Sequence, residues 1–160
     1  MELNSNVISL FHWPQLPPLA PPGRPVLIRV AAAAIRAVAR EQLRVAARQI
    51  LAAWSGRPAH KRQWHETSHG PVYESQIGGL PVAISFSYSG DGGWIGLLRG
   101  GAIGVDAMLV APFAEMDAVA RLYLGPATAA AITAAADPAR AFALAWTKHE
   151  ARLKCHRRGL

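Results

Sequence analysis

Three charged residues in the second half of the chain, Asp106, Glu150 and Lys154, are of types that together serve phosphate chemistry. Asp106 lies in an apolar segment expected to be a strand, and Glu150 and Lys154 are one turn apart on an expected helix. Two carboxylates that folding brings together repel each other unless a cation lies between them. Mg²⁺ needs only one or two protein carboxylates, because water and substrate phosphates complete its shell. Taken alone, these residue types favour the simpler interpretation, an Asp in a turn and an ordinary Glu–Lys helix pair.

A second pattern, in residues 65–69, has the form His-Glu-x-x-His. In zinc proteases both histidines of this motif lie on one helix face and the Glu activates a water molecule. Here Thr67 and Ser68 are poor helix formers, and Gly70-Pro71 stops any helix at once. We therefore expect a turn with surface histidines rather than a zinc site.

Composition predicts one folded domain with polyanionic partners. The 160 residues are 51% hydrophobic, which excludes disorder as the main description. No apolar run reaches the ~18 residues of a membrane span, and the N-terminus lacks the features of a secretory signal. One cysteine excludes an internal disulfide framework, so we expect a cytoplasmic protein. The net charge of +7 favours nucleic acid, a phosphorylated ligand or an acidic protein as partner, although Ala and Arg richness is equally explained by a GC-rich genome.

The order of expected elements predicts an α+β fold. A short strand in residues 4–13 precedes a proline-rich extended connector, 14–25, and a β-rich run, 26–28, leads into a long helix, 31–54. Glycine-rich turns separate three expected strands, 82–88, 94–99 and 102–109, read as two antiparallel hairpins. Three helices are expected after Pro112, the last from Pro138 to about residue 157. Its buried stripe is expected to contain Phe142, Trp146, His149 and Leu153.

The long first helix carries arginines at every fourth position, Arg36, Arg40, Arg44 and Arg48. Such spacing places them on one slowly drifting stripe of the helix. The stripe is either a solvated face or a face turned toward phosphate or an acidic partner.

Several segments resemble the phosphopantetheinyl transferases of the surfactin-synthetase type. The sequences IGVD (103–106), WTKHEARLK (146–154) and RRGL (157–160) resemble the signature blocks of that family. ISFSYSG (84–90) lies where the family has a strand, and ARQILAAWSG (47–56) and YLGPATAAAI (123–132) resemble two of its helices. The resemblance covers about residues 40–160. It implies a single domain of small antiparallel sheets packed with helices, in pseudo-two-fold halves 1–80 and 81–160.

The resemblance also implies an activity. Such an enzyme transfers the 4'-phosphopantetheine arm of coenzyme A to a serine of an acyl or peptidyl carrier protein, releasing adenosine 3',5'-bisphosphate. By motif position, Asp106 and Glu150 would hold Mg²⁺ against the coenzyme A pyrophosphate. Glu150 would also be the general base for the carrier serine, and Lys154 would neutralise a phosphate as charge develops.

The resemblance further implies a set of coenzyme A-binding residues. Ser87 and Tyr88 would face the phosphates of the nucleotide, and Arg44 or Arg48 would contribute at the 3'-phosphate. Lys148, His149 and Lys154 complete the implied set. The basic chain also suits the acidic helix that carrier proteins present, because arginine binds phosphate and carboxylate in a bidentate manner.

The chain departs from the family pattern at several positions. Met108 stands where the family usually has a third acidic metal ligand, Tyr88 where it has a His, and His149 where it has a Lys. Gly70-Pro71 lacks the usual intervening Lys. These departures support an alternative, a catalytically degenerate relative that binds coenzyme A or a carrier protein. A nucleic-acid binder is less favoured, because no aromatic residues are interleaved with the arginine stripe.

Overall fold

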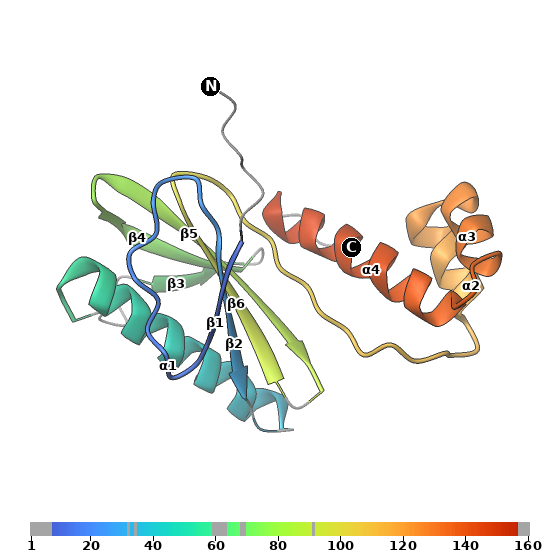
Figure 1. Cartoon of the computed structure of the whole chain (residues 1–160), viewed down its shortest axis with the longest axis horizontal. Coiled ribbons are helices and arrows are strands. Elements are labelled where there is room, and N and C mark those ends of the chain that lie inside the picture. The colour runs from blue at the N-terminus through green and yellow to red at the C-terminus, as the bar shows by residue number, and fades with distance from the viewer. Residues whose placement is uncertain are drawn as a thin grey trace.

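The protein, seen in a computed structural model, is an α+β structure built on one six-stranded sheet (Figure 1). The structure describes residues 8–31, 33, 35–58, 64–67, 70–90 and 92–156. The elements are β1 (Ser9–His12), β2 (Val26–Ala31), α1 (Arg36–Ser55), β3 (Trp64–Thr67), β4 (Gly70–Ile77), β5 (Leu80–Ser89), β6 (Gly92–Arg99), α2 (Met116–Val119), the π-helical turn η2 (Ala120–Leu124), α3 (Pro126–Thr133) and α4 (Pro138–Cys155). The strand order is β1-β2-β6-β5-β4-β3. Only the β1–β2 pair is parallel among the described strand pairs.

Helix α1 covers one face of the sheet and makes the larger hydrophobic core. The alternation of side chains along a strand sends Ile84 and Phe86 of β5 toward this face. They meet Leu43 and Ile50 of α1, which are fully buried. Gly93 of β6 is needed in this layer, because a Cβ there would collide with the Leu43 side chain.

A second, smaller core lies among the C-terminal helices, away from the sheet (Figure 1). Ala120, Ala129, Ile132 and Phe142 form its buried centre. The Phe142 ring stacks on Trp146 at 5.6 Å between centroids. Met108 also packs against this core, so the residue at the implied third metal position contributes to helix packing.

The strand expected at residues 102–109 is wrong. This segment, drawn in gold in Figure 1, runs without regular structure between the sheet and α4. It crosses the sheet face opposite α1, where Gly96 of β6 leaves room for Ile103 and Val105. Its backbone N–H groups at Val105 and Ala107 bond to the serine side chains of β5 rather than to a strand backbone. Apolar composition suggested a strand, but residues 103–108 are only half-buried and their hydrogen-bond partners differ from those of a strand.

The turn expected at residues 65–69 is also wrong where the structure describes it. His65, Glu66 and Thr67 belong to strand β3, which pairs with β4. The Pro71 and Gly70 that were interpreted as punctuation lie inside β4, opposite Glu66 and Thr67. His69 lies outside the described residues. A strand cannot place two histidines one helical turn apart, so the helical zinc motif does not form at residues 64–67.

The other expected elements are present with shifted ends. The long helix begins at Arg36 rather than residue 31, because residues 26–31 continue as β2. Asp137 caps α4 as expected, accepting a hydrogen bond from the Arg140 N–H at 3.0 Å. Of the expected buried stripe on α4, Phe142 is buried, whereas Trp146, His149 and Leu153 are only half-buried.

The sheet is continuous across residue 80, where the resemblance placed the boundary between halves. Strand β5 begins at Leu80 and pairs with β4 on one side and β6 on the other. One mixed sheet thus takes the place of several small antiparallel ones. Among the described helices, none is long and apolar enough to cross a membrane.

A buried arginine fastens the proline-rich connector to the sheet. Arg99, at the end of β6, is only 8% exposed. Its guanidinium donates to the carbonyl oxygens of Ala20 at 2.8 Å and Ile77 at 3.1 Å. Nearby, the Trp54 indole of α1 donates to the Pro17 carbonyl at 2.9 Å. The connector is therefore held by these two long side chains and by the Gly23 N–H, which donates to the Arg99 carbonyl at 3.0 Å, rather than by secondary structure of its own.

We expect Arg99→Met to lower the free energy of unfolding by about 2–3 kcal/mol, because it leaves two buried carbonyl groups without their charged donor. Urea unfolding followed by circular dichroism measures the change. Limited proteolysis should show faster cleavage within residues 14–25. An unchanged unfolding free energy would contradict the role assigned to Arg99.

Candidate functional site

The candidate site lies at the end of β5, beside the segment that carries Asp106. The described β4–β5 pairing runs from Ile77↔Leu80 to Val72↔Ala83, whereas β5 continues to Ser89 alongside β6. Residues 86–89 of β5 therefore extend beyond the last described residue pair between β4 and β5. The Asp106 segment and α4 approach this projecting part from the face opposite α1.

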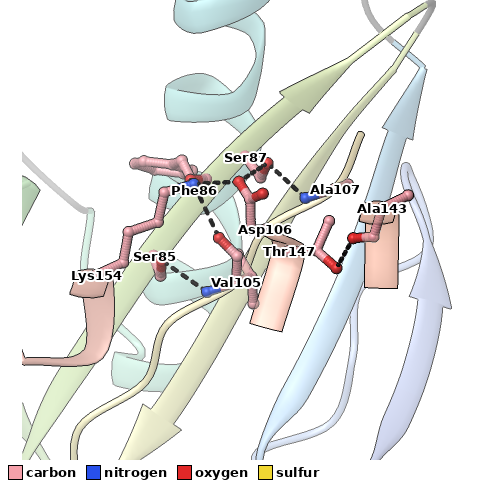
Figure 2. A network of polar contacts seen from close by, with 9 residues as sticks. All are labelled: Ser85, Phe86, Ser87, Val105, Asp106, Ala107, Ala143, Thr147 and Lys154. Atoms are coloured by element: carbon pink, nitrogen blue, oxygen red, sulfur yellow. Dashed lines mark hydrogen bonds and ion pairs between the residues drawn. The ribbon is translucent and has the colours of Figure 1, made fainter. Parts of the chain in front are cut away.

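Two serines of β5 hold the Asp106 segment in register. Ser85 and Ser87 are both buried and point to the same face, because they are two residues apart on a strand. The Ser85 hydroxyl accepts from the Val105 N–H at 3.0 Å. The Ser87 hydroxyl accepts from the Ala107 N–H at 2.9 Å and donates to Asp106 Oδ1 at 3.0 Å (Figure 2). Ser87 thus fixes both the backbone and the carboxylate of the loop.

Lys154 connects α4 to β5 and to the Asp106 segment. Its ammonium donates to Asp106 Oδ1 at 2.6 Å, to the Val105 carbonyl at 3.1 Å and to the Phe86 carbonyl at 3.3 Å (Figure 2). A lysine has three N–H donors, and all three are used here. The Asp106 side chain is 11% exposed and that of Lys154 is 30% exposed. The ion pair is therefore partly shielded from water, which strengthens it relative to a surface pair.

Gly104 lets this segment lie directly on the α4 backbone. A Cβ at Gly104 would collide with the Ala151 carbonyl oxygen and the Cys155 N–H. These are backbone atoms inside a helix, which cannot move aside without breaking the helix. The glycine of the IGVD block is thus required by a close approach between loop and helix.

A pocket of about 370 Å³ opens at this junction. It gathers residues from β5 and the following turn, from α4, from the Asp106 segment and from the start of α1. Its lining includes Ser87, Tyr88, Asp106, Glu150 and Lys154. These residues were singled out from the sequence, and the structure brings all of them to one pocket.

Glu150 contributes a carboxylate oxygen that has no partner in the described structure. Its Oε1 atom is buried and accepts no hydrogen bond. A buried carboxylate oxygen without a donor is costly, so a ligand that supplies positive charge or a hydrogen bond is favoured there.

The donor set fits a cation of the Mg²⁺ type. Asp106 Oδ2 makes none of the described hydrogen bonds, and Glu150 Oε1 is without a partner. No group of three or more His, Cys, Asp or Glu side chains gathers among the described residues. Two carboxylates suffice for Mg²⁺ when phosphate and water supply the remaining oxygens, whereas a closed zinc site would need more ligands.

Other implied binding residues lie elsewhere. The Arg44 guanidinium lies over the Phe86 ring, 5.7 Å from its centroid, and Arg48 pairs with Glu41 at 2.6 Å. Lys148 and His149 line a different hollow, on the other side of α4. These side chains do not line the Asp106–Glu150 pocket.

Arg36 lines the pocket, although the sequence analysis did not assign it to the site. It is exposed, and the described residues offer it no hydrogen bond or ion pair. The regular spacing of the arginines was the available signal, but it could not show which member of the stripe faces the pocket.

We expect Gly104→Ala to destabilise the protein by about 1–3 kcal/mol, because the added methyl group overpacks a backbone contact. It should also separate Asp106 from Lys154. Thermal unfolding measures the first effect. Gly79→Ala is the control, because a Cβ at Gly79 meets no atom within 4 Å and adds only the strain of a positive φ. Equal losses in the two variants would contradict the packing argument.

Comparison with known proteins adds no family to this description. No protein-family model matches the chain, and no curated protein matches it either. The functional argument therefore depends on the site and on the residues themselves.

Proposed function

We propose that the protein transfers the 4'-phosphopantetheine arm of coenzyme A to a serine of an acyl or peptidyl carrier protein. The observation that carries the proposal is the pocket itself. It combines Asp106, a Glu150 oxygen without a partner, and Lys154. Paired carboxylates beside a fixed ammonium suit a divalent cation and a pyrophosphate, which is the chemistry implied by the IGVD and WTKHEARLK blocks.

Each residue has a distinct part in the proposed reaction. Asp106 and Glu150 would hold Mg²⁺, which would supply positive charge against the pyrophosphate and its leaving group. The carrier serine oxygen forms a bond to the β-phosphorus, and the bond to adenosine 3',5'-bisphosphate breaks. Glu150 accepts the serine proton. Lys154 holds Asp106 in place and keeps a positive charge at the pocket wall.

Arg36 extends the phosphate site toward α1. It lies in the first turn of a 20-residue helix that has no acidic residue in that turn and no side-chain cap. The positive end of the helix dipole and the guanidinium therefore favour an anion at the same corner of the pocket. We assign Arg36, instead of Arg44 or Arg48, to a phosphate group of the nucleotide.

A second candidate is a binding protein without turnover. One observation favours it. Met108, which stands where the family has a third acidic ligand, packs against the helical core. The pocket therefore has no third carboxylate from that position. Such a protein would bind coenzyme A in the same pocket without transferring the arm.

The first test is the intact mass of an apo carrier protein after incubation with coenzyme A, Mg²⁺ and the protein. We expect the mass of one phosphopantetheine to be added, and EDTA to prevent this. Glu150→Gln should reduce the rate about 10²–10⁴-fold, because the base is lost. Asp106→Asn should reduce it comparably, because the cation and Lys154 lose their shared partner. Glu115→Gln, an exposed change outside the pocket, is the control.

The same experiment separates the two candidates. Coenzyme A binding without transfer to any carrier would identify the binding protein. Full activity of both pocket variants would contradict the site assignment.

The second test concerns Arg36. We expect Arg36→Ala to weaken the binding of adenosine 3',5'-bisphosphate about tenfold or more, because a charge-assisted phosphate contact is lost. Isothermal titration calorimetry measures the affinity. Arg40→Ala is the matched control, since Arg40 is exposed one turn further along α1 and does not line the pocket. Equal weakening by both changes would indicate general charge attraction instead of a specific contact.

A further inference from the structure

A second hollow lies along the first part of α1, beside the end of β2 and the turn at Trp13. Its volume of about 600 Å³ falls within the range of about 300–1,000 Å³ that is typical of sites for small molecules. None of the residues that line it lines the Asp106–Glu150 pocket. We call it the α1 hollow, and it is a separate candidate site.

One wall of the α1 hollow is an exposed valine stripe on α1. Val38 is 44% exposed and Val45 is 38% exposed, and both line the hollow. They are seven residues apart, which is about two helical turns or roughly 10 Å along the axis, so they share one flank of the helix. A valine side chain makes no hydrogen bonds, so covering this stripe with another apolar group is favourable.

The other walls of the α1 hollow are held in place. Val30 of β2, which is almost fully buried, and the half-buried Trp13 ring both line the hollow and pack against the larger core. The Trp13 backbone N–H donates to the Arg29 carbonyl at 2.9 Å. The chain before α1 is fixed to the helix, because the Ala33 N–H donates to Gln42 Oε1 at 2.9 Å. The hollow is therefore formed before any ligand binds, and Trp13 gives it an aromatic wall.

The charge of the lining disfavours anions. Glu41 is the only side chain in the described lining that carries a charge, and that charge is negative. Its Oε1 atom is already paired with the Arg48 guanidinium at 2.6 Å. The α1 hollow therefore offers no cation to a phosphate or carboxylate, in contrast to the Asp106–Glu150 pocket, which Arg36 lines. Because the rest of the lining is mostly apolar, an uncharged molecule suits it best.

We propose that the α1 hollow binds a small uncharged apolar molecule that contains an aromatic ring. The ring stacks on Trp13, and the rest of the molecule covers Val38 and Val45. The proposal is independent of the proposed transfer reaction, because it uses no residue of the Asp106–Glu150 pocket.

The test uses N-phenyl-1-naphthylamine, an uncharged aromatic dye whose fluorescence rises in an apolar environment. Titration of the dye into the full-length protein should show saturable binding at one site per chain. 1-Naphthylmethanol, which is uncharged, should displace the dye. 1-Naphthoate has the same ring system with a carboxylate, and it should displace the dye about tenfold less well, because the lining offers an anion no partner.

Two variants test the position of the site. Val38→Asp should weaken dye binding about tenfold, because it replaces apolar surface in the α1 hollow with a charge. The first turn of α1 has no acidic residue, and an acidic residue there suits the helix dipole, so this change should leave the fold intact. Ala37→Leu should weaken binding by a similar factor, because the larger side chain fills part of the hollow.

Val110→Asp and Ala53→Leu are the matched controls. They make the same changes at exposed positions that do not line the α1 hollow. Both should bind the dye like the unchanged protein, and circular dichroism checks the fold of each variant. Binding of adenosine 3',5'-bisphosphate should be retained in Ala37→Leu, which separates a failure of this proposal from a failure of the transferase proposal.

Four outcomes would overturn the proposal. Absence of saturable dye binding would mean that the α1 hollow takes no such molecule. Equal displacement by the two naphthyl compounds would contradict the selection against anions. Equal weakening by Val38→Asp and Val110→Asp would mean that the dye adheres to exposed apolar surface in general. Self-association in sedimentation velocity that the dye reverses and Val38→Asp abolishes would assign the hollow to a second copy of the chain.

Discussion

The Lys154 ammonium is the interaction on which the architecture of the site depends. It bonds to the β5 backbone, to the Val105 carbonyl of the Asp106 segment and to the Asp106 carboxylate at once. Residues 102–109 have no strand ladder to hold them, so their position relative to the sheet depends on this ammonium and on Ser85 and Ser87. Because Lys154 is carried by α4, the helical layer and the sheet share one electrostatic anchor. The pocket exists only where that anchor brings the two layers together.

The same anchor determines what the pocket can bind. Asp106 Oδ1 is already engaged by Lys154 and Ser87, whereas Glu150 Oε1 is buried without a donor. The site thus combines the Asp106 carboxylate, which is paired with Lys154, with the Glu150 carboxylate, whose Oε1 has no partner in the described structure. An incoming cation gains most at Glu150, and an incoming phosphate gains most near Arg36, because the three Lys154 donors are already used. A ligand that brings both charges, such as a cation–pyrophosphate complex, satisfies more of the pocket than either ion alone.

Sequence reasoning gathered the pocket residues better than it predicted the backbone. Asp106, Glu150 and Lys154 were placed together by the family resemblance, whereas their types and spacing alone favoured a turn Asp and an ordinary helix pair; the structure brings all three to one pocket. The strand expected at 102–109 failed because the partners of its N–H groups are serine hydroxyls on β5, a tertiary choice that apolar patterning does not encode. Strands β3 and β4 were missed because Gly70-Pro71, a strong turn signal, lies within a strand. Local propensity is overridden where a neighbouring strand supplies the pairing.

The spacing of residues within one short block explains the division of labour on α4. In WTKHEARLK, Glu150 and Lys154 face the Asp106 pocket, whereas Lys148 and Arg152 line the separate hollow between α4 and the η2–α3 pair. The sequence resemblance treats this block as one coenzyme A motif, but the helix directs Glu150 and Lys154 to one side and Lys148 and Arg152, offset by two residues, to the other. Lys148 and His149 line the other hollow and not the Asp106 pocket, and Gly104 packs directly on the α4 backbone between Ala151 and Cys155. The charged residues of the block therefore lie on two different surfaces of one helix.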